Sequence, residues 1–121
     1  MGHGTQRGDR PVTRLDAISA ANVATTLQAL ATPSRLLILT ELRHGALPVG
    51  ELAETIGMER SAVSQQLRLL RNLRLVTATR SGRSIVYRLH DHHVAQLLDE
   101  AIYHCEHLHL GVQDEPDTTA G

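Results

Sequence analysis

Four residues near the C-terminal end of the chain have side chains that commonly bind transition metals. Asp91 and His93 form one pair, and His104 and His107 form a second pair, all within the stretch DHHVAQLLDEAIYHCEH. This stretch is predicted to be one helix with Asp91 as its N-cap. At 100° per residue the three histidines lie within about 60° of one another. The spacing therefore places three imidazoles in one stripe along the helix.

These four side chains cannot all bind one ion within a single chain. His93 and His104 are eleven residues apart, which is roughly 16 Å along a helix, whereas a metal holds its nitrogen ligands at about 2 Å. A second copy of the helix, lying antiparallel, would bring Asp91 and His93 of one chain against His104 and His107 of the other. The pattern thus predicts two equivalent metal sites in a homodimer, related by a two-fold axis near Asp99 and Glu100.

Simpler interpretations of the same residues exist. A chain with eight histidines places some of them three residues apart by chance, and a histidine on a helix flank is often only solvated. A hydrolytic metalloenzyme is disfavoured, because the two residues between His104 and His107 do not match the zinc-protease spacing and no Glu or Ser is placed as base or nucleophile. The helix also has a separate apolar arc for packing: Val94, Leu97, Leu98, Ala101, Ile102, Cys105 and Leu108.

Composition restricts the class of protein. At 121 residues the chain is expected to form one domain with a modest core, which dimerisation would extend. No apolar run approaches the ~18 residues that span a bilayer, and the start does not resemble a signal peptide, so we expect a cytoplasmic protein. Without Phe or Trp the chain lacks the aromatic platform of single-stranded nucleic-acid binders. Its single cysteine, Cys105, is expected to be a small core residue.

Charge is distributed unevenly along a chain whose formal net charge is -1. Residues 58–90 carry seven Arg against one acid, whereas residues 91–121 carry seven acids and no Arg. The first segment suits a polyanion, and the second suits cations.

A flexible arm and three helices are predicted before the basic segment. Residues 1–15 contain three Gly and a Pro without an apolar period, which predicts a mobile arm. Helices are predicted over residues 16–31, from Pro33 to a stop at Gly45, and over residues 49–56. In the second helix the residues expected to be buried are Leu36, Leu37, Leu39 and Leu42.

The helix predicted over residues 60–73 has two distinct faces. Val63, Leu67 and Leu70 are expected to point inward. The opposite face carries the hydroxyl, amide and guanidinium groups that hydrogen-bond base edges and phosphates in a major groove. Its residues are Ser61, Ser64, Gln65, Arg68, Arg71 and Asn72. Because a short helix and a glycine turn precede it, the pattern predicts a helix-turn-helix.

A basic hairpin is predicted directly after this helix. Residues 75–80 and 84–89 alternate and are rich in β-branched side chains, and Ser-Gly-Arg joins them. Arg80 and Arg83 make the hairpin a wing suited to backbone or minor-groove contact. We therefore expect a mainly α-helical winged helix-turn-helix domain with a small β-hairpin over residues 16–110, which binds double-stranded DNA, followed by a disordered tail over residues 111–121.

Three segments resemble the signature blocks of a known family. ATPSRLLILTEL, ELAETIGMERSAVSQQLRLLRNLRLV and RSGRSIVYRL are similar to those of the ArsR/SmtB winged-helix metal-sensing repressors, a resemblance that covers roughly residues 17–110. DHH, YHCEHLHLG and the MGH start most resemble the nickel- and cobalt-sensing branch. The resemblance implies a homodimer through the first and last helices. It also implies a metal site between the two C-terminal helices of the dimer, at Asp91, His93, His104 and His107. The thiolate site of cadmium, lead and arsenic sensors is absent, because residues 47–50 contain no Cys.

The resemblance also implies a function. The expected protein is a repressor and not an enzyme. It would bind operator DNA without metal and dissociate on binding Ni(II) or Co(II). We expect it to bind neither a membrane nor a small-molecule substrate. Four ligands suit tetrahedral Zn(II), whereas nickel and cobalt commonly take more. The amine of Gly2, once Met1 is removed, and the imidazole of His3 would complete a six-coordinate site, as the resemblance implies. The alternatives are a zinc-sensing repressor of the same fold and a metal-independent winged-helix DNA-binding protein.

Two positions depart from the family pattern. Gln66 stands where a His is common in the recognition helix, and Arg74 stands where many members have the Gly that ends it. An Arg at this position must either avoid a positive φ or bear strain of about 1 kcal/mol.

Overall fold

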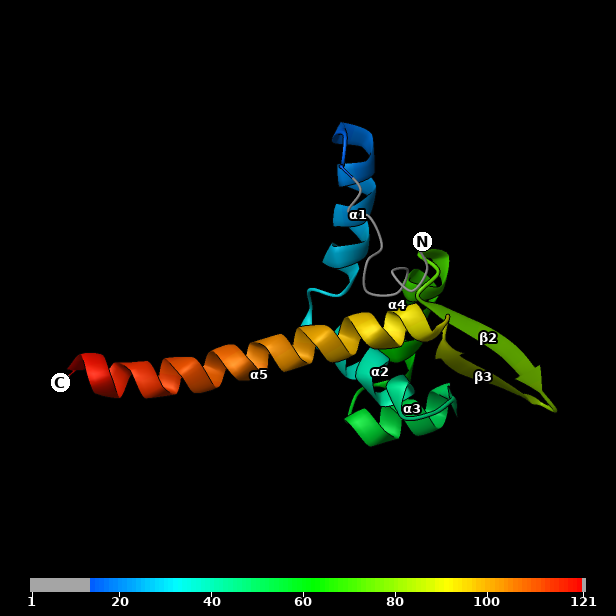
Figure 1. Cartoon of the computed structure of the whole chain (residues 1–121). Coiled ribbons are helices and arrows are strands. Elements are labelled where there is room, and N and C mark those ends of the chain that lie inside the picture. Colours follow the sequence, from blue (N-terminus) through cyan, green and yellow to red (C-terminus); the bar gives the residue numbers. More distant parts are fainter. Residues whose placement is uncertain (1–13, 121) are drawn as a thin grey trace, which may run out of the picture.

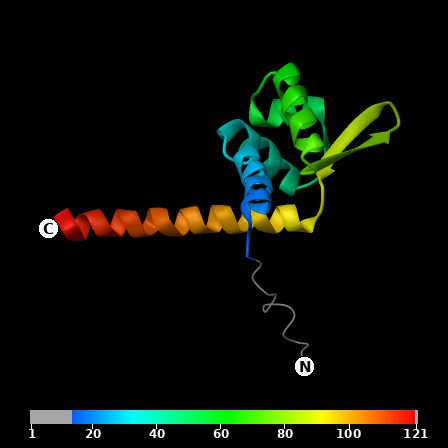
Figure 2. The same ribbon diagram turned by 90° about the horizontal axis from the view of Figure 1, so that it is seen from above.

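A winged helix-turn-helix body carries two helices that reach away from it (Figure 1). The computed structural model describes residues 14–120, and it describes side chains as far as Leu108. Its elements are α1 (Ala17–Ala29), α2 (Pro33–Arg43), β1 (Leu47–Pro48), α3 (Val49–Ile56), α4 (Arg60–Asn72), β2 (Val76–Ser81), β3 (Ser84–Leu89) and α5 (His92–Ala120). The body consists of α2, α3, α4 and the sheet, whereas α1 and most of α5 lie outside it, as Figure 2 also shows. This architecture confirms the predicted fold class.

Local sequence signals fix the ends of the helices. Asp16 caps α1, because its Oδ1 accepts a hydrogen bond from the Ser19 N–H at 2.8 Å while Ser19 Oγ accepts one from the Asp16 N–H at 3.2 Å. Thr32 caps α2, with Pro33 in the first helical position. Gly57 ends α3 with a φ of 72°. Asp16 and Thr32 satisfy first-turn N–H groups, Pro33 has no N–H to satisfy, and Gly57 adopts a positive φ easily. The predicted ends of α1, α2 and α3 are therefore confirmed to within about two residues.

The core lies where α2, α3 and α4 meet the sheet. Val63, Leu67 and Leu70 of α4 are fully buried, as predicted. Leu39 and Leu42 of α2 are also buried. The sequence thus predicted correctly which side of α4 faces inward, and the opposite side is left to solvent.

One residue of α2 was assigned to the wrong face. Leu37 is 49 % exposed, whereas Ile38 is fully buried. Around the helix Ile38, Leu39 and Leu42 span about 100°, and Leu37 lies roughly 150° from the centre of that arc. A run of four consecutive apolar residues, Leu-Leu-Ile-Leu, does not reveal this phase.

The helix α5 is only partly covered by its own chain. Val94 and Leu98 are 7 % and 1 % exposed, whereas Leu97, Ile102 and Leu108 are exposed. Cys105 is exposed as well, so its assignment as a core residue was wrong for the single chain. The physical reason is that the apolar arc continues past the point where α5 leaves the body (Figure 1).

Beyond residue 110 α5 continues to Ala120, within the segment that was expected to be a disordered tail. Adding residues to an existing helix costs much less than starting one, so Val112, Gln113 and their neighbours can extend it. Despite this length, no helix in residues 14–120 is apolar enough to cross a membrane.

The hairpin forms as predicted, and one additional strand joins it. The sheet is antiparallel in the order β1-β3-β2. Ser81 pairs with Ser84, which leaves Gly82, with a φ of 65°, and Arg83 as a two-residue turn. Strand β1 was not predicted, because two residues that include a Pro give no alternation signal.

Arg74 is in the left-handed conformation, with a φ of 62°. The Leu75 N–H donates to the Leu70 carbonyl at 2.9 Å, and the Arg74 N–H donates to the Arg71 carbonyl at 3.0 Å. This is the Schellman pattern that ends helices, with an Arg in the place usually held by Gly. Of the two possibilities at this position, the structure shows the strained one.

We therefore expect Arg74→Gly to raise the free energy of unfolding by about 1 kcal/mol, because Gly adopts a positive φ without a Cβ clash. Chemical denaturation at a fixed protein concentration measures this change. Arg74→Ala is the matched control, since it removes the charge but keeps the Cβ and should not stabilise. Equal stability of the Gly and Ala variants would show that the positive φ of Arg74 does not lower the free energy of unfolding.

Candidate nucleic-acid interface and metal-ligand positions

The outer face of α4 is open and polar. Ser61, Gln65, Arg68 and Arg71 are exposed. A shallow cavity of about 260 Å³ lies along this face and is lined by Ser64, Arg68, Arg71, Asn72 and Tyr87. A helix that buries one side and presents hydroxyl, amide and guanidinium groups on the other has the chemistry to enter a major groove.

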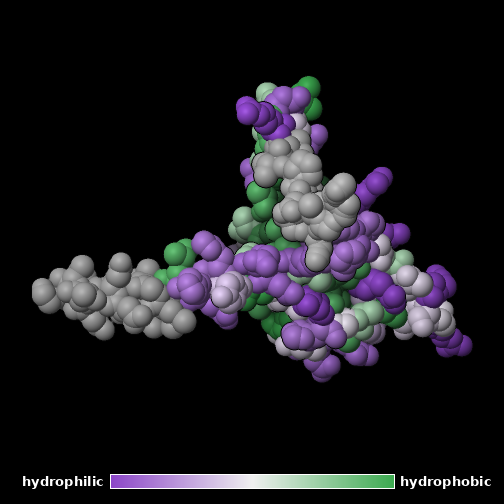
Figure 3. Space-filling model, in the orientation of Figure 1, coloured by the Kyte–Doolittle hydropathy of each residue, from purple (hydrophilic) through white to green (hydrophobic). Residues whose placement is uncertain are grey.

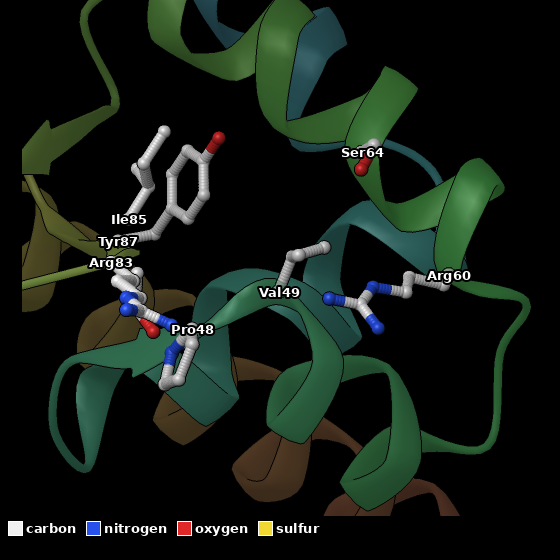
Figure 4. Close-up of a pocket in the computed structure, with 8 residues that line it drawn as sticks. Pro48, Val49, Arg60, Ser64, Arg83, Ile85 and Tyr87 are labelled. Atoms are coloured by element: carbon white, nitrogen blue, oxygen red, sulfur yellow. The ribbon is translucent and has the colours of Figure 1, made fainter. Parts of the chain in front are cut away.

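A second cavity lies at the start of α4. It has a volume of about 370 Å³ and is bounded by Arg60 and Ser64 of α4, by the start of α3, and by the wing (Figure 4). Its wing residues are Arg83, Ser84, Ile85 and Tyr87. Because Ser64 and Tyr87 line both cavities, the two form one groove between α4 and the hairpin.

The wing places its two predicted basic residues at its tip. Arg80 and Arg83 are exposed on either side of the Ser81–Ser84 pair. Figure 1 shows the β2–β3 hairpin reaching away from the body. Arg60 and Tyr87 were not among the predicted DNA-binding residues. Arg60 could have been found from its place in the basic segment, whereas nothing in the sequence connects Tyr87 with the groove.

Gln66 does not join the outer face of α4. Its Oε1 accepts a hydrogen bond from Arg35 Nε of α2 at 2.9 Å. Arg35 Nη1 also donates to the carbonyls of Gln28 and Ala29 at the end of α1, at 3.4 Å each. Arg35 therefore connects α4 with α1, which gives the unusual Gln66 a structural role.

A second arginine of α2 holds α5. Arg43 donates from Nε to Asp99 Oδ1 at 3.0 Å and from Nη2 to Oδ2 at 2.8 Å. The hydrogen bonds and the positive charge of Arg43 hold the pKa of the Asp99 carboxyl below its ordinary value. Both side chains are about half exposed, so the pair orients α5 more than it stabilises the fold.

Asp91 and His93 lie together at the start of α5. Asp91 is the N-cap, as predicted, because its Oδ1 accepts hydrogen bonds from the His93 N–H at 3.0 Å and the Val94 N–H at 3.1 Å. The bond from Val94, and further contacts with His93, hold the pKa of the Asp91 carboxyl below its usual value. Asp91 Oδ2 lies 3.6 Å from His93 Nδ1. The cap thus leaves one carboxylate oxygen beside an imidazole.

His104 and His107 are exposed farther along the same helix. The ring of Tyr103 stacks on that of His107, with centroids 5.8 Å apart. Within the part of the chain that the structure describes, no three His, Cys, Asp or Glu side chains come together as a metal site. One chain therefore presents two separate pairs of potential metal-binding side chains along one helix. Gly2 and His3 lie outside the described residues, and so does the side chain of His109.

Helix α1 also exposes apolar side chains. Only Ala29 of α1 is buried, whereas Ile18, Val23 and Leu27 are between 44 % and 75 % exposed. Figure 3 shows hydrophobic side chains along one side of α1. Exposed apolar faces on two helices are typical of a protein–protein interface.

Known proteins share this sequence and fold. Residues 32–78 match the family model "Bacterial regulatory protein, arsR family". The HTH-type transcriptional regulator NmtR of Mycobacterium tuberculosis is 70 % identical over 114 residues, which cover 94 % of this chain and 95 % of that protein. The solution structure of apo-NmtR has a TM-score of 0.70 and 71 % identity, and covers 90 % of this chain and 92 % of that chain. A homodimeric winged helix-turn-helix DNA-binding domain from Mycobacterium bovis has a TM-score of 0.70 and 33 % identity, and covers 81 % and 94 % of the two chains.

Proposed function

Because this chain belongs to the ArsR family of bacterial regulatory proteins, we propose that it is a homodimeric transcriptional repressor that binds operator DNA without metal and dissociates on binding Ni(II) or Co(II). One observation carries the metal-responsive part of this proposal. The exposed helix α5 holds two ligand pairs that are too far apart to share an ion within one chain.

The DNA-binding part of the proposal assigns roles to α4 and the wing. Ser61, Ser64, Gln65, Arg68 and Arg71 enter the major groove from the outer face of α4 and contact base edges and phosphates. The tip of the wing, with its two arginines, contacts the backbone or the minor groove. Two such units in a dimer would read a palindromic operator.

The metal-binding part places the ligands across the dimer. Asp91 and His93 of one chain, together with His104 and His107 of the other, provide carboxylate and imidazole groups, which suit Zn(II), Ni(II) and Co(II). The amine of Gly2 and the imidazole of His3 would add the two further ligands that nickel and cobalt commonly take. A coordinated ion would join the start of one α5 to the middle of the other, which fixes the geometry of the dimer.

Helix α2 provides a route from α5 to the DNA-binding helix. Arg43 binds Asp99 of α5, and Arg35 binds both Gln66 of α4 and the end of α1. A change in the position of α5 or α1 in the dimer would therefore change the position of α4. The recognition helices would then no longer match successive major grooves, and a coupling free energy of about 1 to 3 kcal/mol is enough to change operator occupancy.

The decisive experiment is a titration of operator binding by the apo protein, carried out in parallel with Ni(II), Co(II) and Zn(II). We expect Ni(II) and Co(II) to weaken operator binding by about 5- to 150-fold. A stronger response to Zn(II), with a tetrahedral absorption spectrum of the Co(II) form, would favour the zinc-sensing alternative. If none of the three metals changes the operator affinity, the protein is a metal-independent DNA-binding protein.

The N-terminal arm is expected to select the metal. His3 is thirteen residues from Asp16 in the sequence. A coil of this length spans roughly 20 Å, which would be enough to reach a neighbouring helix end. Deletion of residues 2–6 should therefore reduce the response to Ni(II) more than the response to Zn(II), measured by metal-dependent release of operator DNA. His3→Ala should reproduce the effect, and Gln6→Ala is the matched control. An intact Ni(II) response after the deletion would show that the arm supplies no ligand.

A further inference from the structure

The cavity at the start of α4 brings together basic groups from two distant parts of the chain. Arg60 is the first residue of α4, and Arg83 lies in the turn of the wing. Figure 4 shows Arg60 reaching over the start of α3 and Arg83 lying beside Pro48 on the other side of Val49. Within the described residues the guanidinium of Arg60 forms no ion pair, so its N–H groups remain available. The hydroxyl of Ser64 also lines this cavity.

Gly50 provides the surface on which the Arg60 guanidinium rests. A Cβ placed at Gly50 would lie 3.4 Å from Cζ of Arg60 and 3.5 Å from each of its two Nη atoms. Near-equal distances to these three atoms mean that the guanidinium lies face-on over the Gly50 backbone. In this orientation the edge of the guanidinium, which carries the N–H donors, is not directed at Gly50. A methyl group would just fit here, but a longer side chain would displace Arg60.

The chemistry of this cavity favours an oxyanion. The chain contains no Lys, so each of its twelve basic side chains is a guanidinium, which binds phosphate through two parallel N–H groups. The volume of about 370 Å³ leaves room for a phosphate with its flanking sugars. The cavity also continues into the groove along the outer face of α4, through Ser64 and Tyr87.

We propose that this cleft holds one phosphate of the DNA backbone in each half-site, bound by Arg60 of α4 and Arg83 of the wing, with Gly50 as the residue that seats Arg60. The inference rests on the proposed DNA-binding function and adds a positioning site to it. This phosphate contact fixes the start of α4 relative to the DNA backbone, and thereby determines which bases Ser64 and Arg68 can reach. Sequence is then read by the outer face of α4, while the cleft sets its register.

The test uses a palindromic duplex that the wild-type homodimer selects from a random-sequence pool. Arg60→Gln removes one phosphate contact per half-site, so the slope of log affinity against log salt should become shallower by about 2 for the dimer. Affinity at low salt should fall by roughly tenfold to a hundredfold. Arg60→Lys should restore the slope, because it restores the charge. Arg14→Gln is the charge-matched control, since Arg14 lines neither cavity.

Two variants at Gly50 test whether this residue positions the Arg60 guanidinium, and neither variant changes a charged residue. Gly50→Ala adds a methyl group that fits against the guanidinium and should leave the salt slope unchanged. Gly50→Leu should displace Arg60 and reproduce the shallower slope of Arg60→Gln. Ethylation of one backbone phosphate per half-site should interfere with binding of the wild type and of Gly50→Ala, but no longer with binding of Arg60→Gln or Gly50→Leu.

The outcomes separate this inference from the proposed function. If Arg68→Ala weakens binding while Arg60→Gln leaves the slope and the interference pattern unchanged, the cleft holds no phosphate and the repressor assignment stands. If the wild type selects no DNA, the proposed function fails and the inference fails with it. Circular dichroism of each variant verifies its fold, and if Arg60→Gln is misfolded, the comparison of Gly50→Leu with Gly50→Ala decides.

Discussion

A mixed dimer of two metal-site variants should bind one metal ion tightly, although neither variant binds metal tightly as a homodimer. In the first variant Asp91 and His93 are changed to Ala, and in the second His104 and His107 are changed to Ala. Each homodimer keeps only one half of every shared site, and two ligands cannot replace four. In the mixed dimer, Asp91 and His93 of the second chain meet His104 and His107 of the first.

The structure gives the reason for expecting this result. His93 and His104 lie on one continuous helix, which separates them by roughly 16 Å. In the described residues no third ligand joins the Asp91 and His93 pair. In the shared-site model a second chain supplies the other two ligands of each site, so the metal content of the mixed dimer should be one ion where the wild type binds two. Equilibrium dialysis with Co(II), which also has an absorption spectrum, measures both numbers.

A second mixed dimer provides the matched control. It joins a wild-type chain to a chain with all four ligands changed to Ala, so it has the same number of ligands as the first mixed dimer. If the sites are shared between chains, this control has two half-sites and should bind no ion tightly. If each site lies within one chain, the control keeps one intact site and the first mixed dimer has none. The two models therefore predict opposite results.

Most of the fold could be predicted because its signals are local. Asp16 with Ser19, Thr32 with Pro33, and Gly57 each satisfy a requirement of a helix end within a few residues of sequence. The two faces of α4 follow from the 3.6-residue period in the same way. The N-cap role of Asp91 is also local, and it places one carboxylate oxygen beside His93.

What could not be predicted depends on contacts between distant segments. The phase of α2 is set by what packs against Ile38, and the apolar run around it fits more than one phase. Cys105 was assigned to a core because it lies on the apolar arc of α5. This arc is longer than the body of one chain can cover, so Cys105 is exposed. The contribution of Arg60 to the groove depends on Gly50 and the wing, which only the folded chain brings near it. The partners of Gln66 and Asp99 are likewise arginines 31 and 56 residues away.

Removing the contact between Arg35 and Gln66 should uncouple metal binding from DNA release. In the wild type we expect metal to lower operator affinity by about 1 to 3 kcal/mol. In Gln66→Ala and Arg35→Ala this difference should fall toward zero, so that the protein stays on its operator when metal is bound. The coupling is a ratio of two operator affinities. It can therefore be measured even if the apo affinity of a variant also changes.

We expect this loss of coupling because two arginines of α2 hydrogen-bond to the neighbouring helices. Arg35 holds α4 through Gln66 and holds α1 through the carbonyls of Gln28 and Ala29, while Arg43 holds α5 through Asp99. Without Arg35, a shift of the dimer helices has no polar connection to the recognition helix among these contacts. The proposed metal ligands on α5 are not altered, so the metal affinity of the free protein should be unchanged.

Linkage provides an independent measurement of the same quantity. Whatever factor metal applies to operator affinity, operator DNA must apply to metal affinity. In the wild type, operator DNA should therefore weaken metal binding, and in Gln66→Ala it should leave metal binding nearly unchanged. Thr40→Ala is the matched control, because Thr40 Oγ1 donates to the Leu36 carbonyl within α2 at 2.7 Å and, among the described residues, hydrogen-bonds to no other helix. If Gln66→Ala and Thr40→Ala both retain the wild-type coupling, the signal reaches α4 through the packing of the dimer and not through Arg35.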